Sequence, residues 1–196
     1  YPGWITLAYL FEHSSNVGAV KVAQTMTPEE FYTMLKKFGL GSRTGIDLPG
    51  ESSGLLSSAK KWDSSTHASM AYGYGASVTP IQMVSAASAL ANDGYRVTPH
   101  IIKYSPEEAE TKIFTTQTMD AQTAHNITKL LTTSINNSKS PIKMARYNVA
   151  AKTGTSKKPK ENSAGYTNKL YTSIIGYLPA ADPQVLIYVL VDSANG

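Results

Sequence analysis

Three segments in the last quarter of the chain are rich in β-branched and aromatic residues, and they restrict the possible folds more than any other feature. They span residues 148–155, 170–178 and 185–192, and such runs are typical of strands. The connection over 179–184 is short enough for an antiparallel hairpin. Residues 185–191 are apolar on both faces, which predicts a central strand covered by helices.

The rest of the chain carries helix signals. Residues 27–30 (TPEE) and 79–82 (TPIQ) each combine a capping box with proline at the first helical position, so a helix is expected to begin at both. Helices followed by an antiparallel sheet predict an α+β fold in which the helices pack on the sheet. Further helices are expected over 4–11, where the helix should be buried, and over 17–25 and 120–135. A long ordered loop is expected over 46–66. Short strands are expected over 97–104 and 112–114, around a charged turn at 106–110.

Composition excludes several classes of site. The chain has 196 residues, 41% hydrophobic and 16% charged, and is expected to form one domain. The absence of cysteine excludes disulfides, thiolate zinc sites and a cysteine nucleophile. The four histidines form no metal-ligand pair, so no metal site is expected. The net charge of +4 is modest, and its densest basic stretch, Lys157, Lys158 and Lys160, is predicted to be a solvated loop, so nucleic acid is not an expected partner.

Two short polar motifs could carry chemistry. SSN, at residues 14–16, lies between two predicted helices, where a sharp turn would project its side chains. KTGT, at residues 152–155, lies at the end of a predicted strand. Each also has a purely structural interpretation: serine and asparagine are favoured helix caps, and a strand can end in a glycine-containing turn with a solvated lysine.

Taken together, the two motifs resemble the Ser-x-Asn and Lys-Thr-Gly signatures of penicillin-binding proteins. The surrounding segments sharpen the resemblance to monofunctional, class B members: FGLG at 38–41, TGIDLPGE at 44–51, and YGYG at 72–75 followed by SVTPIQ at 77–82. The resemblance extends from about residue 7 to residue 192. It implies a β-lactamase-like transpeptidase fold and a peptidoglycan D,D-transpeptidase, with residues 73–75 as scaffold near the cleft.

The resemblance also implies catalytic roles for Ser14, Asn16 and Lys152. The Asn16 amide would face the substrate backbone and help to hold a catalytic lysine, and the Ser14 hydroxyl would relay a proton near the leaving group. Lys152 would supply a positive charge near Ser14 and near the terminal carboxylate of the substrate.

The three residues after that lysine would bind the substrate. The Thr153 hydroxyl would contact the terminal carboxylate, and Gly154 would let the acyl donor lie against the strand and pair with it. The Thr155 backbone N–H would be one donor of the oxyanion hole.

The third family signature, Ser-x-x-Lys, carries the nucleophile and lies roughly 50 residues before Ser-x-Asn. Only 13 residues precede Ser14, and the chain begins at Tyr1 without methionine. The pattern recurs by chance after Ser14, in sites expected to be loops and a turn: Ser57 with Lys60, Ser58 with Lys61, and Ser140 with Lys143. Residues 1–196 are therefore expected to be the carboxy-terminal part of one transpeptidase domain, with the nucleophile upstream.

Alternatives remain open at this point. The chain could be a non-catalytic module that binds stem peptides or a division partner, or a β-lactamase-related hydrolase, although nothing resembles the glutamate-bearing loop of class A β-lactamases. The family resemblance implies no metal or organic cofactor and a catalytic domain on the outer face of the cytoplasmic membrane, with no anchor in these residues. It implies as partners D-Ala-D-Ala stem peptides, β-lactams as covalent inhibitors, and a membrane glycosyltransferase of the elongation or division machinery.

Overall fold

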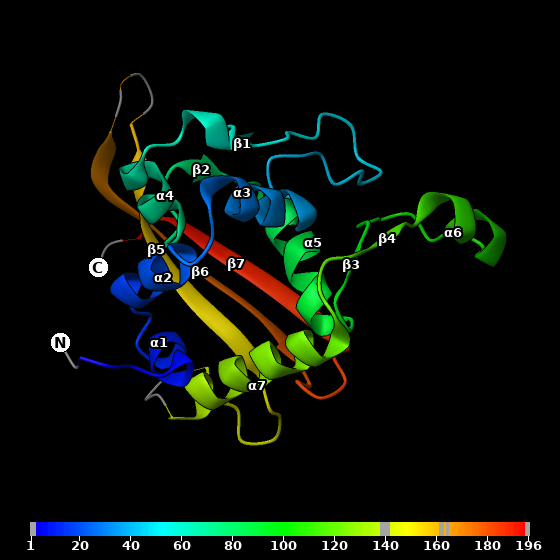
Figure 1. The fold of residues 1–196 in the computed structure, drawn as a ribbon. Helices are drawn as coiled ribbons and strands as arrows, with labels where there is room; N and C mark the ends of the chain where they lie inside the picture. Colours follow the sequence, from blue (N-terminus) through cyan, green and yellow to red (C-terminus); the bar gives the residue numbers. More distant parts are fainter. Residues whose placement is uncertain (1–2, 138–141, 161–162, 164, 195–196) are drawn as a thin grey trace.

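The computed structural model describes residues 3–137, 142–160, 163 and 165–194 (Figure 1). Its α-helices are α1 (Leu7–Glu12), α2 (Asn16–Ala23), α3 (Pro28–Lys37), α4 (Ser64–Met70), α5 (Pro80–Ala91), α6 (Pro106–Lys112) and α7 (Ala121–Asn137), with a short 3₁₀ helix at Ala59–Lys61. Its strands are β1 (Leu55–Leu56), β2 (Ala76–Ser77), β3 (Tyr95–Val97), β4 (Thr115–Gln117), β5 (Ala150–Pro159), β6 (Tyr166–Leu178) and β7 (Val185–Ala194).

The main sheet has three antiparallel strands in the order β5-β6-β7. The predicted α+β arrangement and the hairpin between the last two strands are confirmed. Among the described residues β6 lies in the middle and no strand pairs with the outer side of β7, so the prediction of a central strand over 185–191 is not met there. A strand's place in a sheet depends on its pairing with other strands, which its own composition does not encode.

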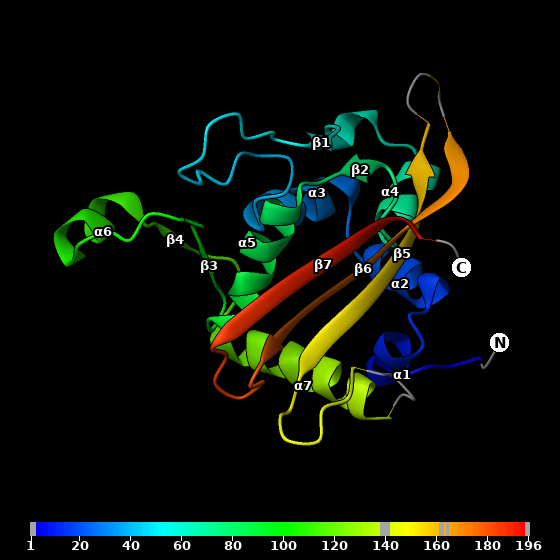
Figure 2. The same cartoon turned by 180° about the vertical axis from the view of Figure 1, so that it is seen from behind.

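Helices cover one face of this sheet, and the other face carries none in the described part of the chain (Figure 2). On the uncovered face Val185, Ile187, Val189 and Val191 of β7 are each about half exposed. The expected cover of residues 185–191 by helices on both faces is therefore not found in the described part of the chain.

The core forms where α7 crosses the sheet. Leu131 of α7, Ala150 of β5 and Tyr177 of β6 are buried together, and Tyr177 is only 2% exposed. The Tyr177 hydroxyl hydrogen-bonds the Thr128 hydroxyl at 2.6 Å, so the one polar atom of this buried ring has a partner. This packing sets the position of β5 relative to the helices.

Both helices predicted from capping boxes are present. Thr27 and Glu30 form the box of α3, and Thr79 and Gln82 form that of α5. The expectation for 4–11 is wrong in part, because α1 starts at Leu7 and buries none of its residues.

Two irregular segments contain more regular structure than expected. The segment 46–66 is not a continuous loop. It includes β1, the 3₁₀ helix and the start of α4, and β1 pairs with β2. The charged segment 106–110 is not a turn but most of α6, capped by a Ser105–Glu108 box. The flanking strands expected over 97–104 and 112–114 lie instead at 95–97 and 115–117, where β3 and β4 pair antiparallel, and residues 98–104 belong to no strand. The helix α6 projects from the body at the end of this pair (Figure 1).

Candidate active site

Ser14 lies in the sharp turn between α1 and α2. Its backbone has a φ of 47°, a left-handed conformation that non-glycine residues seldom adopt. The neighbouring Ser15 caps α2, because its hydroxyl accepts a hydrogen bond from the Gly18 N–H at 3.1 Å. The capping interpretation therefore holds for Ser15, and it leaves the Ser14 side chain available for another partner.

That partner is Lys152 on β5. Its ammonium Nζ donates a hydrogen bond to the Ser14 hydroxyl oxygen, across 138 positions of sequence. The same Nζ donates to the Thr153 carbonyl at 2.9 Å. Desolvation by burial lowers the pKa of Lys152 below its ordinary value. The structure thus brings the two motifs together at one point, where a hydroxyl lies beside an ammonium group.

Asn16 is the first residue of α2, on the same turn, and it is exposed. Among the described contacts, its side chain is hydrogen-bonded to neither Ser14 nor Lys152. Its predicted role toward the substrate and a catalytic lysine therefore stays a prediction.

Thr153, Gly154 and Thr155 are exposed along β5. This strand pairs with β6 on one side, and no described strand pairs with its other side. Such an open edge can accept an extended peptide as an added strand. A Cβ on Gly154 would lie 3.1 Å from the hydroxyl oxygen of Ser173, its partner on β6, so the glycine also relieves crowding within the sheet.

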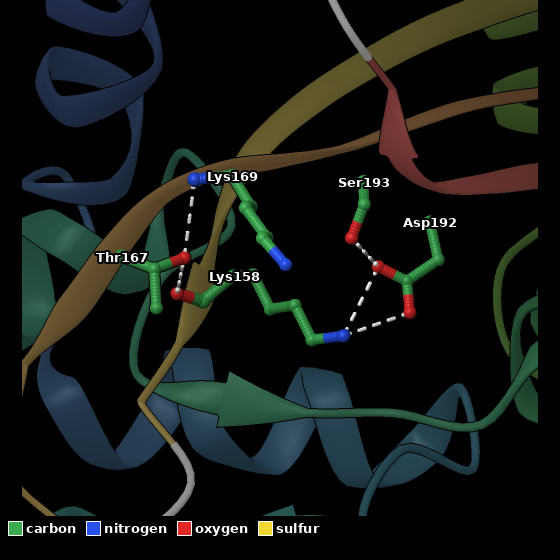
Figure 3. A network of polar contacts seen from close by, with 5 residues as sticks. All are labelled: Lys158, Thr167, Lys169, Asp192 and Ser193. Carbon is green, nitrogen blue, oxygen red and sulfur yellow. Dashed lines mark hydrogen bonds and ion pairs between the residues drawn. The ribbon is translucent and has the colours of Figure 1, made fainter.

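Beyond these residues an ion pair joins the far end of β5 to β7. Lys158 Nζ lies 2.8 Å from the carboxylate of Asp192 on β7, and Ser193 donates a hydrogen bond to the same carboxylate (Figure 3). The Thr167 hydroxyl donates to the Lys158 carbonyl. The Lys158 hydrogen bond is the main cause that lowers the pKa of Asp192. The expectation of a solvated lysine loop is therefore wrong for Lys158, whose side chain is 23% exposed.

The turn at residues 72–75, which carries the YGYG motif, contacts the β5–β6 hairpin through Tyr74. Tyr74 accepts a hydrogen bond at its hydroxyl from the Lys157 backbone N–H at 3.0 Å. Its ring packs edge-on against Tyr166, with centroids 4.8 Å apart. The sequence motif YGYG suggested a scaffold near the cleft, but it carried no signal for this contact.

The chance Ser-x-x-Lys matches lie in ordinary structural positions. The Ser57 hydroxyl accepts a hydrogen bond from the Trp62 indole N–H at 2.9 Å, and Ser58 is the residue before the 3₁₀ helix. Both are exposed, as expected of loop residues. Ser140 and Pro141, the predicted turn, lie outside the described residues.

No group of three or more His, Asp or Glu side chains among the described residues is arranged to hold a metal ion. None of the helices described is both long and apolar enough to cross a membrane.

Comparison with known proteins identifies similar chains. A family model described as the penicillin binding protein transpeptidase domain matches residues 1–196. The chain is 34% identical to penicillin-binding protein PbpB of Mycobacterium tuberculosis, covering 96% of this chain and 30% of that protein. It is 33% identical to a probable peptidoglycan D,D-transpeptidase, PbpC, of Pseudomonas aeruginosa, covering 96% and 33%. The chain thus spans about a third of the length of these relatives.

A solved structure gives the same result for the fold. Penicillin-binding protein 3 of Mycobacterium tuberculosis, crystallised with ampicillin, superposes with a TM-score of 0.86 at 34% identity, over 96% of this chain and 45% of that one. The predicted β-lactamase-like transpeptidase fold is thereby confirmed.

Proposed function

We propose that this chain, which belongs to the penicillin-binding protein transpeptidase domain family, forms the substrate cleft of a serine D,D-transpeptidase that cross-links peptidoglycan. The observation that carries the proposal is the hydrogen bond between Lys152 Nζ and Ser14 Oγ at the exposed edge of β5. This bond lies beside a strand edge that could hold an extended peptide, where it would supply a proton and a positive charge.

The reaction would proceed in two acyl transfers. A nucleophilic serine attacks the penultimate carbonyl of a stem peptide ending in D-Ala-D-Ala, and the amide bond to the terminal D-Ala breaks. The proton that the departing amine needs would pass through Ser14. An amine of a neighbouring stem peptide then attacks the serine ester and forms the cross-link, which regenerates the serine.

Each cleft residue has a defined place in that chemistry. Lys152 would attract the substrate's terminal carboxylate, and the Thr153 hydroxyl would hydrogen-bond it. The Thr155 N–H would stabilise the oxyanion, and loss of one such donor typically costs about 2.7–4 kcal/mol of transition-state stabilisation. Asn16 would contact the substrate backbone from the turn that bears Ser14.

The remaining parts of the proposal concern the longer protein. We place the nucleophile in a Ser-x-x-Lys segment upstream of these residues, which agrees with relatives about three times as long. We place the protein at the cytoplasmic membrane, with this domain on the outer side and a membrane glycosyltransferase of the elongation or division machinery as partner. β-Lactams would acylate the serine, in line with the relative solved with ampicillin.

The test is acylation of the full-length protein by a fluorescent penicillin, with Lys152→Ala compared with wild type. We expect wild type to become labelled and Lys152→Ala to lose labelling while its thermal unfolding stays cooperative. Lys157→Ala is the matched control, because it removes another lysine from β5 and keeps its backbone N–H, and it should label like wild type.

The outcomes separate the possible functions. Absence of labelling in wild type would favour a non-catalytic binding module. Rapid turnover of a chromogenic cephalosporin, in place of a persistent acyl-enzyme, would favour a β-lactamase-related hydrolase. Wild-type labelling of Lys152→Ala would show that the cleft lies elsewhere.

A further inference from the structure

The Tyr74 hydroxyl occupies a hydrogen-bonding position on the open edge of β5. In an antiparallel pair, alternate residues direct their backbone N–H and C=O groups toward the partner strand, and those between direct them away. The register of β5 with β6 is regular from Ala150 to Lys157. Since the Lys157 N–H bonds Tyr74 and not β6, the N–H groups of Thr153 and Thr155 point to the open edge as well.

The N–H groups of Thr153, Thr155 and Lys157 form a short row of donors along the open edge of β5, and the Tyr74 hydroxyl already accepts from the last of them. No described side chain accepts a hydrogen bond from the Thr153 or the Thr155 N–H, whereas the Lys157 N–H is bonded to Tyr74. The next residue to pair with β6 after Lys157 is Pro159, across an irregularity in register, and proline has no N–H. The open row of donors therefore ends between Thr155 and Lys157.

Tyr74 is held in this position from several sides. Its ring contacts Tyr166 edge-on at 4.8 Å and Tyr72 at 5.7 Å between centroids. Its backbone N–H donates to the Ser69 carbonyl of α4 at 3.0 Å. Gly75, with a φ of 86°, follows it in a conformation that favours glycine. The hydroxyl is therefore a fixed element of the scaffold.

We propose that Tyr74 is the end stop of the peptide site on β5, so that it sets how many residues of the acyl donor pair with the strand. This inference rests on the proposed function, which puts the donor's terminal carboxylate at Lys152 and Thr153 and its penultimate carbonyl at the Thr155 N–H, so its amino side would extend from there toward Lys157. The donor then pairs with Thr153 and Thr155 only. Residues farther toward its amino end leave the strand and gain no backbone hydrogen bond at Lys157.

The test uses the full-length protein and N-acetylated peptides ending in D-Ala-D-Ala, lengthened by one alanine at a time on the amino side. For wild type, we expect kcat/KM to stop rising once the peptide reaches Thr155. Tyr74→Phe keeps the ring and removes the hydroxyl, which exposes the Lys157 N–H. In this variant, peptides long enough to reach Lys157 should gain about 2- to 10-fold in kcat/KM, the range expected for one net hydrogen bond. Tyr72→Phe is the matched control from the same turn and should retain the wild-type length dependence.

Failure of this inference can be distinguished from failure of the proposed function. If wild type does not react with fluorescent penicillin, the proposed function fails. If wild type reacts, but its length dependence equals that of Tyr74→Phe, the end stop is refuted. Loss of reactivity toward short peptides in Tyr74→Phe, with unchanged thermal stability, would also refute it, because an end stop does not touch the short donor.

Discussion

Two neighbouring serines in the candidate site have different hydrogen-bond partners. Ser15 caps α2, which leaves the adjacent Ser14 hydroxyl to meet Lys152. The motif SSN alone could not distinguish these two uses, because capping and catalysis favour the same residue types. Only the second motif, on a strand far along the chain, made the catalytic interpretation the better one.

Gly154 provides a prediction at this scale. In the full-length protein, Gly154→Ala should slow penicillin acylation on the order of 100-fold, the effect of shifting a substrate by about 1 Å. Part of that effect could come from the Ser173 hydroxyl, which a Cβ at Gly154 would meet at 3.1 Å. The second-order acylation rate of the double variant with Ser173→Ala separates the causes. We expect the double variant to stay slow and Ser173→Ala alone to match wild type; full recovery in the double variant would make Gly154 a packing residue only.

The packing of α7 on the sheet keeps β5, and with it Lys152, in place. Leu131 is 6% exposed in the core cluster, so Leu131→Ala should lower the free energy of unfolding by about 2–5 kcal/mol. Lys129→Ala on the exposed side of the same helix is the control and should change it by less than about 0.5 kcal/mol. Urea denaturation of both variants measures the difference. Equal values for the two would mean that α7 does not carry the core.

The elements that sequence patterns predicted well are those with local causes. The boxes of α3 and α5 are each contained in four residues, and both helices begin there. The same signal, Ser105 with Glu108 and a proline after the cap, also begins α6, within a segment whose charges alone favour a turn. The position of β7 beside β6, with no described strand on its other side, depends by contrast on strand pairing, and the bond from Lys157 to Tyr74 joins residues 83 positions apart. No local pattern encodes such contacts.

For the molecule as a whole, the segment that carries α6 is fastened by Asp47. Its carboxylate accepts hydrogen bonds from the Ile101 and Ile102 N–H groups, both at 2.8 Å, and from the Tyr104 hydroxyl. The Ile102 bond is the largest cause that lowers the pKa of Asp47 below 3.8. The folded protein thus holds this carboxyl as an anion to a lower pH than the unfolded chain does.

The pH dependence of stability follows from that shift. The stabilisation from ionised Asp47 is complete above its unfolded pKa and is lost as pH falls through the lower folded value. Asp47→Asn should therefore be less stable than wild type at neutral pH, and the difference should shrink below about pH 3.8. Urea denaturation midpoints across this pH range measure the stability difference, with Asp182→Asn as control. Amide exchange at Ile101 and Ile102 reports on the same hydrogen bonds. A difference that does not change with pH would contradict the assignment.

The distance along the chain between Ser14 and Lys152 also has a consequence for biosynthesis. The turn that bears Ser14 leaves the ribosome before its partner, which is made 138 residues later, and β5 must pair with β6 before the lysine has a fixed place. Closing so long a loop belongs to the late, non-local steps of folding. A nascent chain that ends before β6 therefore has all of the SSN turn but no paired β5 to hold Lys152, so the contact between the two motifs marks molecules whose translation has passed the hairpin.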